Sequence, residues 1–234
     1  MCTVAESQHH GFLFEQRVVA AADALRDGGA RDRAATEYTA RFDMAPELDP
    51  TGQNTPTCIK IAKRATNGRV RVDMADARRV VGLSQTPLTR LVVGIYDQVG
   101  GVKRVSEVRQ YLIDGETWKQ AAGGVSSETI TQFHEQLAEG TPQQARAFAV
   151  QRKAELAIEH PATLKWAHKV DSKKQRRLQC SLYLDDLDTL VGKQEAASVS
   201  IHTEDTAPFW NMTLPLELPS LPRVRKSKHN EEIE

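Results

Sequence analysis

Residues 90–96, with the sequence RLVVGIY, are the feature that most restricts how this chain can fold. The segment is short and almost entirely apolar, which is typical of a strand buried on both faces. We therefore expect it to be the central strand of a β-sheet.

Residues 11–27 are predicted to form the first helix, because apolar side chains recur there at helical spacing. The predicted stripe consists of Phe12, Glu15, Val19, Ala22 and Leu25. Glu15 is its charged member, so it must lie at the edge of the core or have a partner there. A salt bridge with an arginine is the purely structural alternative.

The rest of the chain alternates strand and helix patterns, which indicates an α/β fold with a mixed sheet flanked by helices. Strands are expected at residues 38–44, 57–63, 69–73, 103–113, 166–170 and 177–183. Further helices are expected at 75–81 and 142–160, the latter opened by the capping box TPQQ at 141–144. We expect residues 1–220 to form one domain and 221–234 a flexible charged tail.

The charge pattern is compatible with nucleic-acid binding. The 31 basic and 31 acidic side chains cancel, which argues against a histone-like protein. Residues 60–79, however, contain seven basic and two acidic side chains, and residues 169–177 contain five and one. Such patches suit a protein that holds phosphates, although ordinary solvated surfaces contain them too.

No apolar run approaches membrane length, and the N-terminus MCTVAESQHH has no secretory pattern. The three cysteines, Cys2, Cys58 and Cys180, form neither a disulfide framework nor a zinc spacing. This favours a reducing, cytoplasmic location.

Asp43 and Lys60 form the candidate catalytic pair. Asp43 ends one predicted strand, and Lys60 lies in the next, on the same face as Cys58 and Ala62. Hydrolysis of a phosphodiester with Mg²⁺ needs a carboxylate to hold the metal and a lysine to orient water or stabilise the phosphate. The same spacing also occurs by chance.

The segments RFD and CIK, separated by a proline-rich loop, resemble the PD-(D/E)XK motif of type II restriction endonucleases. The start of the first helix, HGFLFEQRV, is similar to the opening helix of such enzymes. The resemblance implies a restriction-endonuclease-like fold that cuts double-stranded DNA with Mg²⁺. It assigns Asp43 to the metal, Lys60 to the lysine and Glu15 to the helix glutamate that completes the metal site.

Cys58 departs from the family, which usually has an acid two residues before its lysine. Cysteine is a poor ligand for Mg²⁺, which prefers oxygen. Asp73 and Asp76 are the candidate replacements, together with Glu15, and Asp73 is included among the expected metal ligands. Alternatively, Asp76 stabilises a helix N-terminus, and Asp73 pairs with Arg71 or Arg78.

The segment DSKKQRRLQCSL resembles a basic, glutamine-rich stretch associated with DNA contact in these enzymes. The candidate DNA-binding residues are Lys173, Lys174, Gln175, Arg176, Arg177 and Gln179. Arginine and glutamine can recognise base edges and lysine can reach phosphates, whereas a charged sheet edge that resists aggregation is the structural alternative.

The resemblance therefore divides the domain into a catalytic core at about 11–115 and a DNA-contacting part at about 120–220. A palindromic target would require a homodimer, and a cognate DNA methyltransferase is expected in the same system. The alternatives are a DNA-binding protein that has lost its metal site, and an intracellular protein with no role in nucleic-acid binding.

Overall fold

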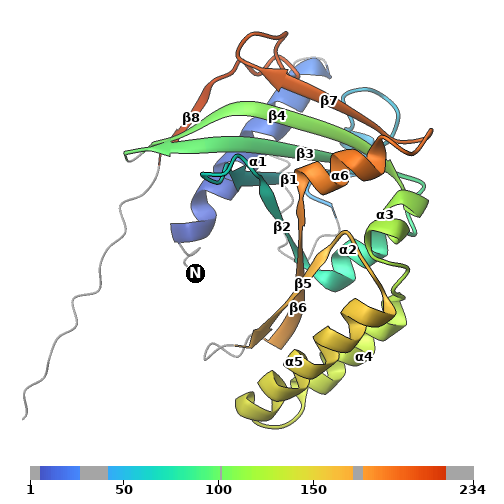
Figure 1. Ribbon diagram of the computed structural model, residues 1–234. Helices are drawn as coiled ribbons and strands as arrows, with labels where there is room; N and C mark the ends of the chain where they lie inside the picture. The colour runs from blue at the N-terminus through green and yellow to red at the C-terminus, as the bar shows by residue number, and fades with distance from the viewer. Residues whose placement is uncertain (1–5, 27–41, 101, 171–175, 220–234) are drawn as a thin grey trace, which may run out of the picture.

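The computed structural model describes residues 6–26, 42–100, 102–170 and 176–219, and the side chains from residue 11 onward within these ranges. The main sheet contains β1 (Thr57–Lys63), β3 (Leu88–Val99), β4 (Val102–Asp114) and β7 (Ser198–Thr203), in that order, and β8 (Leu216–Pro219) pairs with the other end of β4 (Figure 1). β1 is parallel to β3, and the other pairs are antiparallel. The chain is therefore a mixed α/β protein, as predicted.

β3 lies inside this sheet, between β1 and β4, and its residues 89–96 are buried. The prediction that residues 90–96 form a central strand is confirmed. Leu91, Val93 and Ile95 point into the larger hydrophobic core, and Val92 points into a smaller core on the opposite face. Both faces are covered, which explains why residues 91–95 are apolar.

Helix α1 (Glu6–Leu25) covers the second face of the main sheet, so the first predicted helix is confirmed. The predicted stripe is only partly correct. Phe14 and Val18 are fully buried along with Ala22, whereas Phe12 is 45% and Leu25 is 42% exposed. The buried set follows an i, i+4, i+8 spacing, which describes the same helix rotated slightly from the predicted orientation.

A second, antiparallel sheet has the order β2 (Arg71–Asp76), β6 (Arg176–Tyr183) and β5 (Lys165–Val170). Helices α2 (Ala77–Leu83), α4 (Ser127–Ala138) and α5 (Pro142–Glu159) lie beside it (Figure 1). One continuous core includes buried residues from both sheets. The two sheets therefore belong to one packed unit, and because β7 and β8 join the main sheet, that sheet extends beyond residues 11–115.

Local sequence signals predicted the start of α5 correctly and the start of α2 within two residues. The capping box is present: the Gln144 amide donates to Thr141 Oγ1 over 3.3 Å, and the Thr141 amide donates to Gln144 Oε1 over 2.8 Å. The short helix begins at 77 rather than 75, because Ala75 has φ +66° at a bulge in β2 and Asp76 then forms the N-cap.

No prediction covered α6 (Leu184–Val191), β7 or β8, and α3 (Gly115–Ala121) and α4 were expected only as part of a generally helical middle region. Most of the strand expected at 38–44 and the expected tail at 221–234 lie outside the described residues. Within the ranges that the structure describes, no helix is long and apolar enough to cross a membrane.

Candidate active site

The candidate site lies at the outer edge of β1. β3 is hydrogen-bonded to the other side of β1, so the Ile59 amide and carbonyl can point away from the sheet. Asp43 fills this edge. Its Oδ2 accepts a 2.6 Å hydrogen bond from the Ile59 amide, while the amides of Asp43 and Met44 both donate to the Thr57 carbonyl. The backbone of β1 therefore fixes the position of the carboxylate.

Two cations hold the same carboxylate. Lys60 Nζ lies 2.8 Å from Asp43 Oδ2 and 2.9 Å from the Ile59 carbonyl. Arg79, from α2, donates from Nη2 to Asp43 Oδ1 over 2.7 Å. Burial alone would raise the pKa of Asp43, but the charges and hydrogen bonds of Lys60 and Arg79 outweigh burial and lower it. Asp43 is therefore an ionised, buried carboxylate.

Glu15 approaches this cluster from α1. The pKa of Glu15 is raised from 4.5 to about 7, first by burial and then by the negative charge of Asp43, while the charges of Lys60 and Arg79 oppose the rise. Lys60 and Arg79 both form their ion pairs with Asp43. The site thus combines one carboxylate that is always charged near neutral pH with a second one that gains or loses a proton there.

Cys58 does not replace the missing acid. Its side chain is 1% exposed and packs in the larger core, and burial raises the pKa of its thiol. The thiol contacts Arg79. Arg79 therefore contacts both Cys58, at the position where the family has an acid, and the carboxylate of Asp43.

Asp73 and Asp76, the two proposed replacements, contact other residues. Asp73 Oδ1 accepts from the Ala75 amide over 2.8 Å, within the bulge of β2. Asp76 caps α2 through the Arg78 amide and pairs with the Arg78 side chain at 3.0 Å. The structural alternative for Asp76, a charge at a helix N-terminus, is confirmed.

Among the described residues, no group of three or more His, Cys, Asp and Glu side chains could hold a metal. The Glu15 carboxylate is close enough to interact electrostatically with Asp43, and the Ile59 carbonyl contacts Lys60, the partner of Asp43. Mg²⁺ in proteins is often held by one or two carboxylates together with water and substrate phosphates. Glu15 and Asp43 are the two carboxylates of this kind near the edge of β1, and both oxygens of Asp43 are engaged by Lys60 and Arg79.

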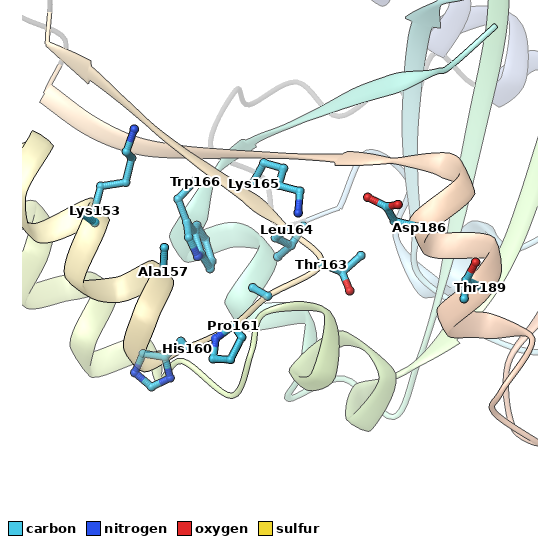
Figure 2. Close-up of a pocket in the computed structure, with 12 residues that line it drawn as sticks. Lys153, Ala157, His160, Pro161, Thr163, Leu164, Lys165, Trp166, Asp186 and Thr189 are labelled. Carbon is cyan, nitrogen blue, oxygen red and sulfur yellow. The ribbon is translucent and has the colours of Figure 1, made fainter. Parts of the chain in front are cut away.

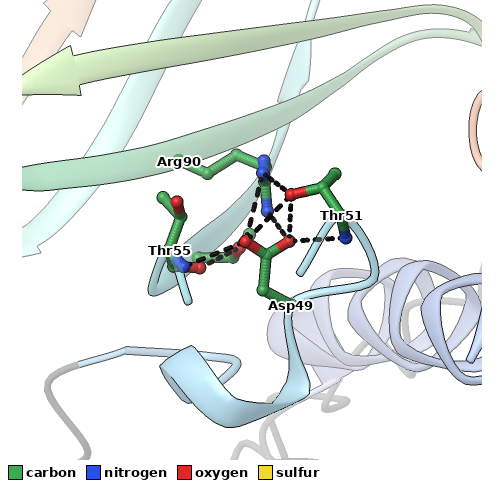
Figure 3. A network of polar contacts seen from close by, with 5 residues as sticks. Asp49, Thr51, Thr55 and Arg90 are labelled. Atoms are coloured by element: carbon green, nitrogen blue, oxygen red, sulfur yellow. Dashed lines mark hydrogen bonds and ion pairs between the residues drawn. The ribbon is translucent and has the colours of Figure 1, made fainter. Parts of the chain in front are cut away.

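A second polar network anchors the loop between Asp43 and β1 (Figure 3). Asp49 Oδ1 lies 2.6 Å from Arg90 Nη1, and both side chains are almost completely buried. The amides of Thr51 and Thr55 donate to the two Asp49 oxygens over 3.0 and 2.9 Å. Because Arg90 belongs to β3, this network ties the loop to the rigid centre of the main sheet.

The predicted DNA-contacting residues have mixed placements. Arg176 donates to four carbonyls at residues 137–140, so it caps the C-terminal end of α4. Arg177 and Gln179 are half-buried on β6, which is the middle strand of its sheet and not an edge. Lys173, Lys174 and Gln175 lie outside the described residues.

A groove of about 820 Å³ lies between α5, β5 and α6. Trp166 and Leu164 contribute to its lining, with Lys153, Lys165 and Asp186 around them (Figure 2). None of the residues at the edge of β1 lines this groove, so its size does not make it the candidate active site.

Sequence reasoning missed Arg79. The only available signal was the basic pair Arg78-Arg79 after a strand, and the pair does not reveal which member turns toward Asp43. Comparisons with models of protein families, with curated proteins and with solved structures find no match. The site therefore has to be interpreted from its geometry.

Proposed function

We propose that this chain is a Mg²⁺-dependent endonuclease of the restriction type that hydrolyses double-stranded DNA. The observation that carries the proposal is the meeting of Glu15, Asp43 and Lys60, from three separate segments, at the edge of β1. The resemblance to the PD-(D/E)XK motif predicted this combination from the sequence. A restriction-endonuclease-like fold for the mixed sheet is part of the proposal.

In this mechanism Glu15 and Asp43 would hold Mg²⁺, and the bound ion would stabilise the charge that develops on the scissile phosphate. Asp43 must release at least part of its contact with Arg79 and Lys60 to do so, since both of its oxygens are engaged. Lys60 then turns toward the attacking water or a phosphate oxygen. Glu15 must lose its proton to act as a ligand, and it can do this near neutral pH.

Cleavage would leave a 5′-phosphate and a 3′-hydroxyl, as the resemblance implies. A homodimer would match a palindromic target, because two-fold symmetric DNA is best contacted by a two-fold symmetric protein. A cognate DNA methyltransferase would protect the host DNA.

The test is incubation of plasmid DNA with wild type, Lys60→Ala and Asp43→Asn, with Mg²⁺ or EDTA. Wild type should cut only with Mg²⁺, and both variants should bind DNA without cutting it. Lys63→Ala is the matched control, because Lys63 is an exposed lysine of the same strand and should retain cleavage. Full cleavage by either site variant would refute the proposal.

A second candidate is a DNA-binding protein without catalytic activity. It is favoured by Cys58, which stands where the family has an acid, and by Arg79, which already neutralises Asp43. Such a protein would shift DNA in gels equally well with Mg²⁺ and EDTA, and would leave plasmid DNA intact at every metal concentration.

A further inference from the structure

A group of basic residues surrounds β5 and plays no part in the site at β1. β5 is the outer strand of its sheet, and neither β5 nor its partner β6 contains an acidic residue. We call the group the β5 basic edge. It consists of Arg146, Lys153, Lys165, His168 and Lys169.

Two of these cations come from α5. Arg146 and Lys153 are seven residues apart, so they lie on one face of the helix. Arg146 Nε donates to the Val170 carbonyl over 3.1 Å, which places its guanidinium at the end of β5. Lys153 lies beside Trp166 of β5 in the groove (Figure 2).

His168 lies between these cations. Burial lowers the pKa of His168, and the charges of Lys153 and Arg146 lower it further. Its buried Nδ1 has no hydrogen-bond partner among the described residues. Lys165 and Lys169 lie on the opposite face of the same strand, and Lys169 is directly opposite Arg177 of β6.

Like charges gathered in this way repel one another unless acids or a bound anion offset them. In the part of the chain that the structure describes, Arg146, Lys153, Lys165 and Lys169 form no ion pair, whereas Arg104, Lys119 and Arg152 each have an acidic partner. Asp186 is an acid near Lys165 in the groove, but it pairs with Arg69 at 3.4 Å. Among the described residues, the four Lys and Arg side chains of the β5 basic edge therefore have no acidic partner within 4 Å.

The spacing of the charges favours a long anion over a small one. Arg146 and Lys153 are about 10 Å apart along the helix axis, and Lys165 and Lys169 are about 13 Å apart along the strand. A single phosphate cannot reach them all, whereas the phosphate backbone of a duplex presents many charges in a row.

We propose that the β5 basic edge is the surface on which this protein docks the phosphate backbone of double-stranded DNA. The choice of DNA as the polyanion rests on the proposed function. The surface comes from α5 and β5, separate from the β1 site, so it would hold the duplex and would take no part in hydrolysis.

The experiment measures the affinity for a fluorescently labelled DNA duplex in EDTA, between about 50 and 200 mM salt. The variant Arg146→Ala/Lys153→Ala/Lys169→Ala removes three charges of the surface. Each lost phosphate contact should lower the steepness of log K against log salt by about 0.9. The slope for the triple variant should therefore be shallower than that of wild type by about two to three. Its affinity at the lower salt should fall at least about tenfold.

The matched control, Arg104→Ala/Lys119→Ala/Arg152→Ala, removes three charges from other ion pairs and should keep the wild-type steepness. Thermal unfolding of both variants checks that each is folded. An equal loss in the two variants, or no loss in the first, overturns the proposal. Binding of wild type to phosphatidylserine vesicles but not to the duplex also overturns it.

The result separates this proposal from the nuclease activity. A protein that binds DNA through the β5 basic edge but never cuts it would refute the nuclease and keep the surface. A protein that cuts with Mg²⁺, and whose triple variant retains the wild-type salt dependence, would refute the surface and keep the nuclease.

Discussion

Replacing Asp49 with asparagine should destabilise the fold strongly, because it removes the charge that balances buried Arg90. The side chains of Arg90 and Asp49 are 1% and 0% exposed. Burial would raise the pKa of Asp49, but hydrogen bonds from Arg90, Thr51 and Thr55 lower it from 3.8 to about 2. That difference corresponds to about 2.4 kcal/mol of stabilisation of the ionised form.

Asp49→Asn should therefore lower the free energy of unfolding by about 3 kcal/mol, since a buried pair that loses one partner costs about 3–5 kcal/mol. Urea unfolding followed by tryptophan fluorescence measures the loss, and the melting temperature should fall by about 6–12 °C. Glu204→Gln, which breaks an exposed pair with Arg104, is the control and should cost less than about 1 kcal/mol.

The pH dependence gives an independent check. Because the pKa of Asp49 is lower in the folded state, its contribution is present above pH 4 and is lost as the pH falls toward 2. The difference in stability between wild type and Asp49→Asn should shrink across this range. A loss below about 1 kcal/mol at pH 7, or a difference that does not change between pH 4 and 2, would refute the reasoning.

Two further predictions concern α1. The pKa of Glu15 is raised from 4.5 to about 7, mainly by burial, so the folded state holds this proton more tightly and stability should fall as the pH rises through that range. Unfolding measurements at pH 5 and pH 8 should show a smaller fall for Glu15→Gln than for wild type. An unchanged pH dependence of stability would contradict this assignment. In β3, a Cβ added at Gly94 would lie 2.5 Å from Phe14 Cζ, so Gly94→Ala should cost about 1–3 kcal/mol. Adding Phe14→Leu should recover part of that loss, and a neutral Gly94→Ala would show that α1 packs elsewhere.

Much of the secondary structure followed from short-range patterns. The strand at 57–63 was predicted with its final bounds, because alternation over seven residues is a local property. The helix beginning at Pro142 followed from its capping box. β7 and β8 were missed, because both lie at the outside of the sheet, where exposed residues carry no strong apolar pattern.

The candidate site was predicted in part. Asp43 and Lys60 were selected because adjacent strands can place a carboxylate and a lysine together, and the resemblance to the PD-(D/E)XK motif added Glu15. Asp73 and Asp76 were selected because they are acids close in sequence, yet their carboxylates contact the β2 bulge and α2. Sequence distance does not report which side of a bulge a side chain faces.

What the sequence determined by itself is the elements with a strong local pattern, such as α1, β1, β3 and α5, since propensity, capping and alternation act over a few neighbouring residues. Only the tertiary structure decided that Arg79 joins Asp43, that Arg176 caps α4, and that cations from α5 and β5 gather around one strand edge. Those contacts join segments tens of residues apart, and their geometry depends on how helices and sheets pack around the shared core.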